Sequence, residues 1–305
     1  MNFIRYKAAT RIGNWLFQIA FARLLGSAPI AFYVRPEVST SLLEQFGELY
    51  PDISFTHNLP QGIVVFEEET LCANDFRLPA ERDNLLLDGY FQFPQLFSRK
   101  ELITQFQCPV RIMSVIKEKY AAPLSSPLAV GISVRRGDYL RLPHRHPFVG
   151  RSYLSKAVFS FPDDSTFLVC SDDIQWCKAF FTENRFPGRR FVLVEGEEVL
   201  TQLFLQTMCH HNIISNSSFS WWGAYLNPHD NAIAVFPSMW YGMQKPEIGN
   251  YLYYPEAKII HNRYGLCQWL HAVALCGKTG LGRVLRSLGV YTPSVRERIP
   301  GSFLR

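Results

Sequence analysis

The sequence predicts an α/β fold built on parallel sheets. Apolar, β-rich runs alternate with stretches of helical periodicity along almost the whole chain, the pattern of strands covered by helices. Runs such as Phe167 to Val169 and Phe191 to Val194 are apolar at every position, as strands buried on both faces are. The 305 residues are 48% hydrophobic and 19% charged, which provides for real cores and excludes a disordered chain.

Short apolar runs bounded by turn residues predict the strands, and the longer stretches between them predict the helices. In chain order, the strands are expected at residues 3–6, 30–34, 63–66, 128–134, 166–170, 191–194, 212–215 and 232–236. The helices are expected at residues 15–25, 94–104, 153–159, 174–181, 198–208 and 219–226. Strands followed by helices in this order indicate repeated βαβ units.

The segment from Ala121 to Pro127 predicts a linker, because it holds small residues and two prolines and has no periodicity of its own. We therefore expect an N-terminal α/β domain at residues 1–122 and a C-terminal α/β domain at residues 127–262, each with the size of one core. Two such Rossmann-like domains are expected to face an interdomain cleft, which is a common place for a ligand.

The positive charge is concentrated at the C-terminal end. The formal net charge is +5, and residues 278–305 alone carry six Lys or Arg and one Glu. The body is therefore neutral, which argues against a nucleic-acid binder with a basic docking face. We expect residues 263–305 to form a basic helical tail. Two roles stay open for it: a helix packed on the body, or a peripheral contact with anionic membrane lipid through residues 278–305.

Cysteines and apolar runs indicate the compartment. The seven cysteines include no C-x-x-C pair and lie mostly in apolar runs, which is typical of reduced thiols in a cytosolic protein. Residues 1–7 lack the pattern of a secretory signal, and no apolar run reaches the ~20 residues that span a bilayer. We expect a cytoplasmic protein that is soluble or lies on a membrane surface.

Residues 11–18 (Arg-Ile-Gly-Asn-Trp-Leu-Phe-Gln) follow the first strand and open a helix. Gly13 lets the backbone approach a bound group, and the free N–H groups at a helix start favour an anion such as phosphate. The alternative is a turn at Gly13 and Asn14 that only caps the helix.

Two arginines end an apolar strand in residues 132–139 (Ile-Ser-Val-Arg-Arg-Gly-Asp-Tyr). Open α/β sheets bind ligands at the carboxyl ends of their strands, where an arginine offers a fork of donors to phosphate. Strand alternation puts Ser133 and Arg135 on one face and Arg136 on the other, so we expect one arginine to grip the ligand and the other to brace the loop. The alternative is an Arg-Asp ion pair at the surface.

Two carboxylates, Asp172 and Asp173, follow the strand expected at residues 166–170 and precede a helix. A carboxylate in that position can bind the 2-amino edge of guanine or a ribose hydroxyl. The alternative is helix N-capping, and we expect one aspartate to cap and the other to bind.

Residues 215–224 (Ser-Asn-Ser-Ser-Phe-Ser-Trp-Trp-Gly-Ala) again join a strand end to a helix. The serine hydroxyls and the amide of Asn216 form a polar cradle suited to phosphate oxygens at a helix N-terminus. The alternative is a capping box above a core of Trp221 and Trp222.

Five segments with these features occur in order: Gly13 to Gln18, Gly89 to Gln92, Arg135 to Tyr139, Ser171 to Cys177 and Asn216 to Ala224. Together the chain, over about residues 3–240, resembles the bacterial α-1,2-fucosyltransferases of glycosyltransferase family 11. The resemblance implies a GT-B fold, GDP-fucose as donor, a β-galactoside as acceptor, inversion at the fucose anomeric carbon and no metal. It also implies that the first domain holds the acceptor and the second GDP-fucose.

The resemblance implies roles for individual residues. Arg135 would contact the β-phosphate, one of the two aspartates would contact the nucleoside, and Gly13 and Asn14 would reach across the cleft from the first domain. The implied donor-binding residues of the second domain are Ser133, Arg135, Asp172, Asp173, Asn216, Ser217, Ser218 and Phe219.

One position departs from the family. The usual motif is His-x-Arg-Arg-Gly-Asp, and its first position here is Ser133. In related fucosyltransferases that histidine helps to hold guanine, whereas a serine hydroxyl can donate or accept one hydrogen bond there. We expect the difference to affect donor affinity or selectivity for guanine.

The sequence also indicates whether a cation holds the diphosphate and which residue could act as the general base. No two aspartates lie two positions apart, so the Asp-x-Asp that holds a cation in the other main fold of nucleotide-sugar transferases is missing. The GDP leaving group then depends on cationic side chains and backbone N–H groups. Direct displacement needs a base for the acceptor proton, and Asp138 is the nearest carboxylate. The alternatives are that Asp138 braces Arg136, or that the departing phosphate takes the proton.

Other functions stay open. The second enzyme hypothesis is a fucosyltransferase that forms another linkage, and the hypothesis from another class is a non-catalytic nucleotide-sugar or glycan-binding module. His144 and His146 lack ligand-spaced partners and favour a loop, with an acceptor-site role as the alternative. A lipid contact of the tail would hold an enzyme near lipopolysaccharide or capsule acceptors at the cytoplasmic face of the membrane.

Overall fold

The computed structural model describes residues 1–7, 11–26, 29–35, 46–73, 75–80, 82–242 and 252–276. The chain divides into two compact units, Met1–Pro109 and Val110–Arg305. We describe each unit by itself.

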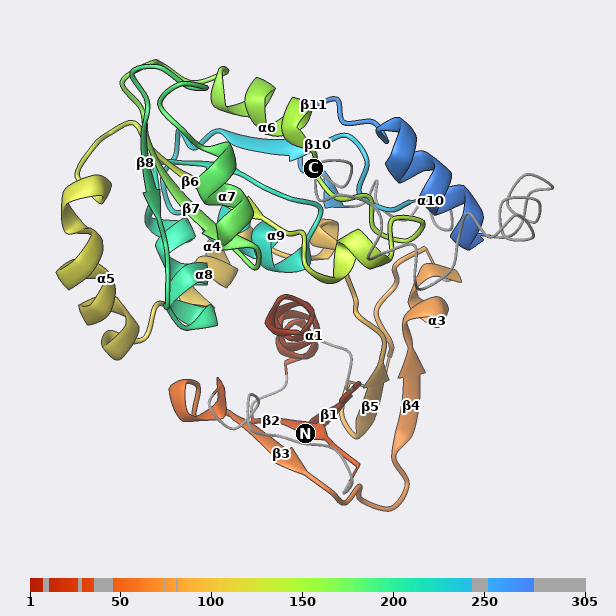
Figure 1. The fold of residues 1–305 in the computed structure, drawn as a ribbon. Coiled ribbons are helices and arrows are strands. Elements are labelled where there is room, and N and C mark those ends of the chain that lie inside the picture. Colours follow the sequence, from red (N-terminus) through yellow and green to blue (C-terminus); the bar gives the residue numbers. More distant parts are fainter. Residues whose placement is uncertain are drawn as a thin grey trace. The chain divides into compact units, whose positions relative to one another are not determined.

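Unit 1 is built on a five-stranded sheet in the order β3-β2-β1-β5-β4, and all of its strand pairs are parallel (Figure 1). Ile4 of β1 lies opposite Phe32 of β2 and Leu87 of β5. The strands are β1 (Asn2–Arg5), β2 (Ile30–Tyr33), β3 (Ile53–Thr56), β4 (Val64–Glu67) and β5 (Leu85–Asp88).

One apolar helix, α1 (Ile12–Leu24), contributes ten buried residues to unit 1. Its Trp15 ring lies 6.0 Å from the ring of Phe32, and its Phe21 ring stacks 4.2 Å from the ring of Phe91. Trp15 and Phe21 are fully buried, so α1 is held by packing on the sheet. Other helices of unit 1 whose bounds lie within the described residues are α3 (Glu68–Ala73), the 3-10 turn η1 (Pro94–Leu96) and α4 (Arg99–Gln105).

Unit 2 is built on a six-stranded parallel sheet in the order β11-β10-β9-β6-β7-β8. With β6 as its first strand, this is the strand order of the dinucleotide-binding Rossmann sheet, in which ligands bind where the order reverses. That point lies between β6 and β9. The strands are β6 (Ala129–Val134), β7 (Thr166–Ser171), β8 (Arg190–Leu193), β9 (His211–Ile213), β10 (Ala234–Pro237) and β11 (Ala257–Ile260).

Helices cover both faces of this sheet (Figure 1). On one face, Val130, Ile132 and Val134 of β6 share an apolar core with residues of α6 and α7. The side chain of Ser133 points to the other face, where it meets Ser220 of α9. The helical elements are α5 (Val110–Leu124), η2 (Asp138–Arg141), α6 (Arg151–Val158), α7 (Ile174–Phe180), α8 (Val199–Met208), α9 (Ser218–Tyr225) and α10 (Leu266–Cys276).

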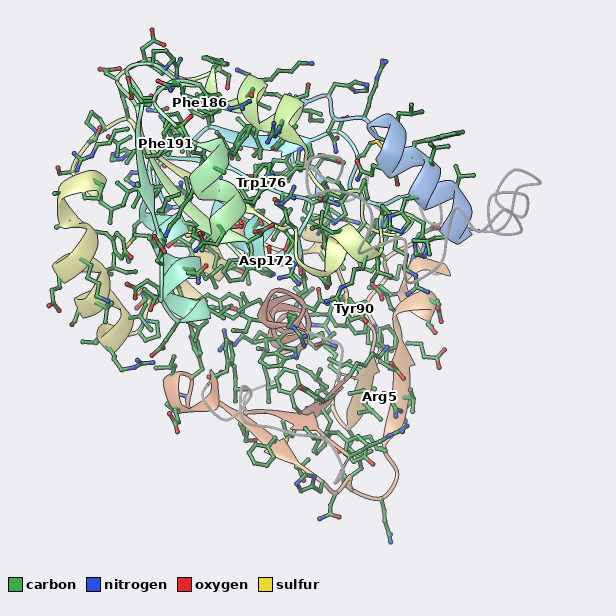
Figure 2. All side chains as sticks on the ribbon, in the orientation of Figure 1. Arg5, Tyr90, Asp172, Trp176, Phe186 and Phe191 are labelled. Atoms are coloured by element: carbon green, nitrogen blue, oxygen red, sulfur yellow. The ribbon has the colours of Figure 1, made fainter. Side chains whose placement is uncertain are left out.

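Aromatic side chains fill the core beside α7 (Figure 2). Trp176 and Phe180 stack with ring centroids 4.9 Å apart, and the rings of Phe186 and Phe191 lie 5.4 Å apart. Burial of such large rings stabilises the strand end from which Asp172 and Asp173 project.

The predicted fold class, α/β with two Rossmann-like units, is confirmed by these two parallel sheets. Several elements were missed. The strands β3, β5 and β11 and the helices α3 and α5 were not predicted, whereas α10 lies within the helical tail expected at residues 263–305. The helix expected at residues 94–104 is divided into η1 and α4, with Ser98 as N-cap of α4. Ser98 accepts a hydrogen bond from the backbone of Glu101 at 3.4 Å, which starts a new helix there.

The predicted linker at residues 121–127 is wrong, because residues 121–124 form the last turn of α5 and the two units meet at Pro109 and Val110. Three side chains of α5, Ile112, Ile116 and Tyr120, are buried at helical spacing. Pro123 lies in the last turn, where it removes the hydrogen bond that an N–H would donate to the carbonyl of Lys119, and the helix ends one residue later at Leu124.

Ion pairs explain why α5 belongs to the second unit and not to the first. Arg111 donates two hydrogen bonds to Glu198, at 2.9 and 2.8 Å, and Lys119 pairs with Glu197 at 2.9 Å. The tyrosine hydroxyl of Tyr120 also donates to Glu197. These contacts fasten α5 to the start of α8.

The predicted basic tail, residues 263–305, is described only in part. Its first half contains α10, and the basic residues 278–305 lie outside the described residues. In the described part of the chain, no helix is both long enough and apolar enough to cross a bilayer.

Candidate active site

The candidate site of unit 2 lies at the carboxyl ends of β6 and β9, where the strand order reverses. Ser215, which follows β9, ties the two strand ends together: its Oγ accepts a hydrogen bond from the backbone N–H of Arg135 at 2.9 Å and donates one to the carbonyl of Ser133 at 2.7 Å. The backbone of Arg135 is thus fixed by a side chain of the neighbouring strand.

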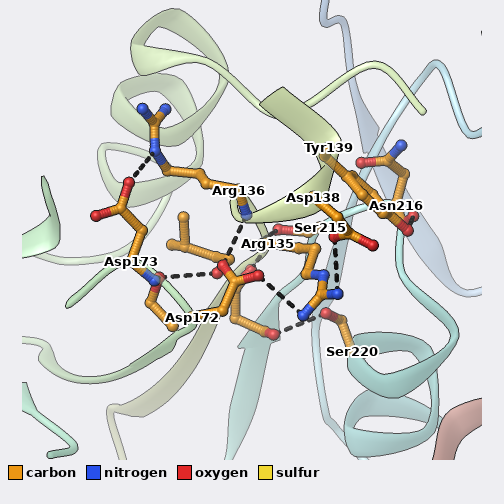
Figure 3. Close-up of polar contacts among 12 residues, drawn as sticks. Arg135, Arg136, Asp138, Tyr139, Asp172, Asp173, Ser215, Asn216 and Ser220 are labelled. Carbon is orange, nitrogen blue, oxygen red and sulfur yellow. Dashed lines mark hydrogen bonds and ion pairs between the residues drawn. The ribbon is translucent and has the colours of Figure 1, made fainter. Parts of the chain in front are cut away.

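The guanidinium of Arg135 lies between two carboxylates (Figure 3). Its Nη2 pairs with Asp138 Oδ1 at 2.7 Å and its Nη1 with Asp172 Oδ2 at 2.8 Å. The side chain is 32% exposed and lies over the ring of Tyr139, 5.6 Å from its centroid. A solvent-accessible guanidinium at this edge of the sheet is the group that phosphate recognition requires.

Asp172 makes two contacts with the arginine segment. Its Oδ1 accepts the backbone N–H of Arg136 at 2.8 Å, and its Oδ2 pairs with Arg135. A Cβ at Gly137 would lie only 2.6 Å from that Oδ2, so the carboxylate occupies the space that a side chain would need. Glycine at 137 follows from this close approach.

Arg136 and Asp173 form a separate, structural pair. Arg136 is buried, its Nε donates to Asp173 Oδ2 at 3.0 Å, and its guanidinium lies 4.0 Å over the ring of Trp176. Burial lowers the pKa of Arg136, and the carboxylate of Asp173 opposes that shift. Asp173 also caps α7, because its Oδ1 accepts the backbone N–H of Trp176 at 3.3 Å.

These positions decide between the interpretations of two motifs. The two arginines do point to opposite sides, and Arg136 is the one that braces, so the alternative of a surface ion pair is wrong for it. Arg135 does form an ion pair with Asp138, with side chains 32% and 49% exposed, as that alternative described, and a role of Arg135 in gripping a ligand stays a prediction. The alternative that Asp138 braces Arg136 is also wrong: Asp138 pairs with Arg135, and Asp173 holds Arg136. Of the two aspartates, Asp173 is the cap.

The side chains of Ser133 and Asn216 make hydrogen bonds within the protein. Ser133 is buried with its Oγ 2.7 Å from Ser220 Oγ. The side-chain Nδ2 of Asn216 donates to the carbonyl of Trp240 at 2.8 Å, and the backbone carbonyl of Asn216 accepts the hydroxyl of Tyr139 at 3.0 Å. The side-chain Oδ1 of Asn216 is buried and has no hydrogen-bond partner among the described residues. In this conformation Ser133 contacts α9, and the backbone of Asn216 holds Tyr139.

The start of α9 lies next to this cluster. Ser217 is at the N-cap position but makes no side-chain cap hydrogen bond, so the capping-box alternative is wrong. Trp221 and Trp222 are fully buried, as the core interpretation required. Ser218 and Phe219 are only partly buried, and they occupy the first turn, where helix N–H groups attract anions.

Sequence reasoning missed what Tyr139 and Ser215 do. Tyr139 lies under Arg135, its hydroxyl is bonded to Asn216, and burial raises its pKa, so it stays a donor. The His146 ring stacks on Tyr139 at 4.6 Å, and burial lowers the pKa of His146 although Asp138 opposes the shift. Tyr139 is the last residue of the arginine motif, and His146 follows it closely. The aromatic rings of these two residues were the sequence signal available for their contact.

The predicted residues of unit 1 lie in the first turn of α1. Gly13 is buried, and Asn14 Oδ1 accepts a hydrogen bond from Gln92 Nε2 at 2.9 Å. The N-cap position of α1 is Arg11, so the capping turn at Gly13 and Asn14 is wrong. Gln18 donates to the carbonyl of Gly89 at 2.7 Å, which joins the first two motifs within this unit.

A second carboxylate organises the Gly89 to Gln92 motif. Glu68 accepts the backbone N–H groups of Tyr90 and Phe91, both at 3.0 Å. Phe91 has a φ of 52°, in the left-handed region, and its ring stacks on Phe21. A role of Gly13 and Asn14 toward the donor stays a prediction.

Within the described ranges, no group of three or more His, Cys, Asp or Glu side chains is arranged to hold a metal ion. The carboxylates of Asp172 and Asp173 each contact an arginine and a backbone N–H. The chemistry that this arrangement offers is cationic and hydrogen-bonding recognition of an anion, with one half-exposed carboxylate, Asp138, at its edge.

Comparison with known proteins adds the following. The model of the family described as glycosyl transferase family 11 matches residues 74–254. The chain is 35% identical over 120 residues to the O-antigen biosynthesis glycosyltransferase WbnK of Escherichia coli, which covers 36% of this chain and 38% of that protein. It is 28% identical over 175 residues to an alpha-1,2-colitosyltransferase of Escherichia coli, covering 55% of this chain and 59% of that protein.

A mammalian relative is similar too. The galactoside 2-alpha-L-fucosyltransferase Sec1 of Mus musculus is 32% identical over 141 residues, covering 42% of this chain and 36% of that protein. The chain thus matches less than two thirds of the length of each of these relatives. The family match covers more than half of this chain and includes the segments that hold Arg135, Asp172 and Asn216. The chain belongs to glycosyl transferase family 11.

Proposed function

We propose that this protein transfers L-fucose from GDP-β-L-fucose to the 2-hydroxyl of a terminal β-galactoside in a glycan, with inversion and without a metal. The observation that carries the proposal is the accessible guanidinium of Arg135 at the carboxyl ends of β6 and β9, beside the N-terminus of α9. The names of the relatives support sugar transfer, and the Sec1 name supports this linkage.

A site of this kind would stabilise the GDP leaving group during transfer. When the bond between fucose and GDP breaks, negative charge develops on the β-phosphate, and fixed cationic or N–H groups stabilise that charge. Arg135 supplies a guanidinium N–H group, and the first turn of α9 at Ser218 and Phe219 supplies a helix N-terminus. No Asp-x-Asp for a diphosphate-bound cation occurs in the sequence, so the arginine takes that role.

The transfer step follows. The acceptor 2-hydroxyl oxygen forms a bond to the fucose anomeric carbon, while the bond from that carbon to the phosphate oxygen breaks and its electron pair leaves with GDP. The acceptor proton passes to the carboxylate of Asp138, which is 49% exposed and therefore accessible to a bound sugar. A carboxylate within hydrogen-bond reach is the usual agent of such proton removal.

Three alternatives are tested with the same assay. The relative named alpha-1,2-colitosyltransferase makes the colitose nucleotide the second donor to examine. A non-catalytic nucleotide-sugar or glycan-binding module would bind a donor and release neither GDP nor sugar. A fucosyltransferase of another linkage would differ only in its product.

The experiment incubates the full chain with GDP-fucose or GDP-colitose and a panel of β-galactosides, with and without EDTA, and identifies products by mass and linkage analysis. The proposal expects an α-1,2-fucosylated product whose yield EDTA does not change. Transfer from GDP-colitose alone would contradict GDP-fucose as the donor. A product with another linkage would contradict transfer to the 2-hydroxyl, and loss of activity in EDTA would contradict a reaction without a metal. Binding without turnover would contradict enzymatic function.

Peripheral membrane contact belongs to the same proposal. Residues 278–305 carry six basic residues and one acidic residue, a charge that attracts anionic lipid. Binding to vesicles with and without phosphatidylglycerol, compared between the full chain and a chain ending at residue 277, tests it. Equal binding of both chains would contradict the lipid contact.

A further inference from the structure

We propose that Asp172 is a positioning residue that aims Arg135 at the donor diphosphate, and that Asp138 is the partner which the diphosphate replaces on Arg135. This inference rests on the proposed function, because it assumes that a nucleoside diphosphate is the ligand. It gives opposite roles to two carboxylates that contact the same guanidinium.

The two ion pairs of Arg135 are unequal. Asp172 is held through both of its oxygens, by Arg135 and by the backbone N–H of Arg136, and its side chain is 25% exposed. Asp138 makes one pair, with Arg135 Nη2, and its side chain is 49% exposed. An exposed pair contributes little to stability and is readily exchanged. A phosphate oxygen would therefore displace Asp138 from Arg135 and leave Asp172 in place.

The backbone supports the same asymmetry. The space beside Gly137 is filled by the carboxylate of Asp172, with Oδ2 where a Cβ would collide. Ser215 fixes the backbone N–H of Arg135 at 2.9 Å. Arg135 is thus held at its backbone and at Nη1, and Nη2 is the end that can change partner.

Charge repulsion favours the exchange. Arg135 and Arg136 face three carboxylates, Asp138, Asp172 and Asp173, so an incoming diphosphate meets a cluster that already has excess negative charge. Repulsion between the diphosphate and the nearest exposed carboxylate disfavours the original pairing. When Nη2 binds phosphate, Asp138 loses its cation and becomes available to accept the acceptor proton. The base would then be free only when the donor is bound.

The test measures GDP affinity by calorimetry and steady-state transfer for Asp138→Asn and Asp172→Asn, with Asp164→Asn, an exposed aspartate away from the arginines, as matched control. Removing the competing carboxylate should tighten GDP binding by about two- to fivefold in Asp138→Asn, the effect of an exposed pair. The same variant should lose about 100-fold in kcat, because the base is gone.

Asp172→Asn should weaken GDP binding by about tenfold, because it removes the ion pair that positions Arg135. It should also raise the donor KM more than it lowers kcat. Gly137→Ala keeps every charge and displaces the carboxylate, so it should shift donor KM in the same direction. Circular dichroism spectra like that of the wild type show that a variant is folded.

Weaker GDP binding in Asp138→Asn, or unchanged binding in both Asp172→Asn and Gly137→Ala, would overturn the inference while leaving GDP as the ligand. Failure of the wild-type chain to bind GDP would instead overturn the proposed function, and this inference with it.

Discussion

Arg136 and Asp173 are joined across two loops: the guanidinium Nε lies 3.0 Å from Asp173 Oδ2, and the arginine side chain is only 3% exposed. The pair links the end of β6 to the start of α7, and the ring of Trp176 lies 4.0 Å from the guanidinium. Arg135 is the next residue, so the geometry of the candidate site depends on this pair.

Asp173→Ala should therefore destabilise the protein by about 3 kcal/mol, because it leaves a buried guanidinium without its carboxylate and removes the cap of α7. Urea denaturation of the variant and of Asp164→Ala measures the difference. A loss of less than about 1 kcal/mol, no more than a surface substitution causes, would contradict the structural role.

Ser133→Ala tests what the serine at the histidine position of the motif does. Ser133 Oγ is 2.7 Å from Ser220 Oγ, so the variant should lose about 1 kcal/mol of stability and change the GDP affinity by less than about twofold. Denaturation and calorimetry give the two values. A tenfold loss of GDP affinity in a stable variant would instead show that Ser133 holds the nucleobase.

Protonation of His146 should contribute to the pH dependence of the unfolding free energy. Burial lowers the pKa of its imidazole below the ordinary value of 6.5, against the opposing effect of Asp138 and with Arg145, His144 and Arg135 lowering it further. A histidine whose pKa is lowered by folding binds its proton more readily when unfolded, so its share of stability is complete above pH 6.5 and is lost as the pH falls.

The unfolding free energy should therefore fall between pH 7.5 and pH 5.5, and it should fall less in His146→Phe, which keeps an aromatic ring on Tyr139. Urea titrations of both proteins at the two pH values give the comparison. An equal fall in both proteins would contradict the assignment to His146.

The sheet core and the site differ in how well the sequence predicts them. The runs at residues 167–170 and 191–194 are apolar at every position, which indicates a strand, and both strands are present. The expected burial on both faces is correct for β7, whereas β8 is an edge strand whose residues are exposed or only partly buried. The strand β3, Ile53–Thr56, was missed because its central residues are exposed. Helix α5 was missed because Pro123 in its last turn and Pro127 just after it indicated a linker and obscured the spacing of Ile112, Ile116 and Tyr120.

For the site, strand alternation correctly separated Arg135 from Arg136. The partner of each arginine could not be predicted, because three aspartates lie within reach in the sequence and only the fold selects among them. The shortest sequence distance suggested Asp138 as a brace for Arg136, whereas Asp173, on a different strand end, holds it. Ser215 acts from yet another strand, which no local pattern reveals.

The central claim is that Arg135 binds the diphosphate of the donor. The most direct measurement is the GDP affinity of Arg135→Ala, with Arg190→Ala, an exposed arginine of β8, as matched control. We predict that Arg135→Ala keeps the wild-type fold and binds GDP about 10- to 100-fold more weakly, as loss of charge-assisted hydrogen bonds does, while Arg190→Ala binds like the wild type. Wild-type GDP affinity in Arg135→Ala would contradict the claim.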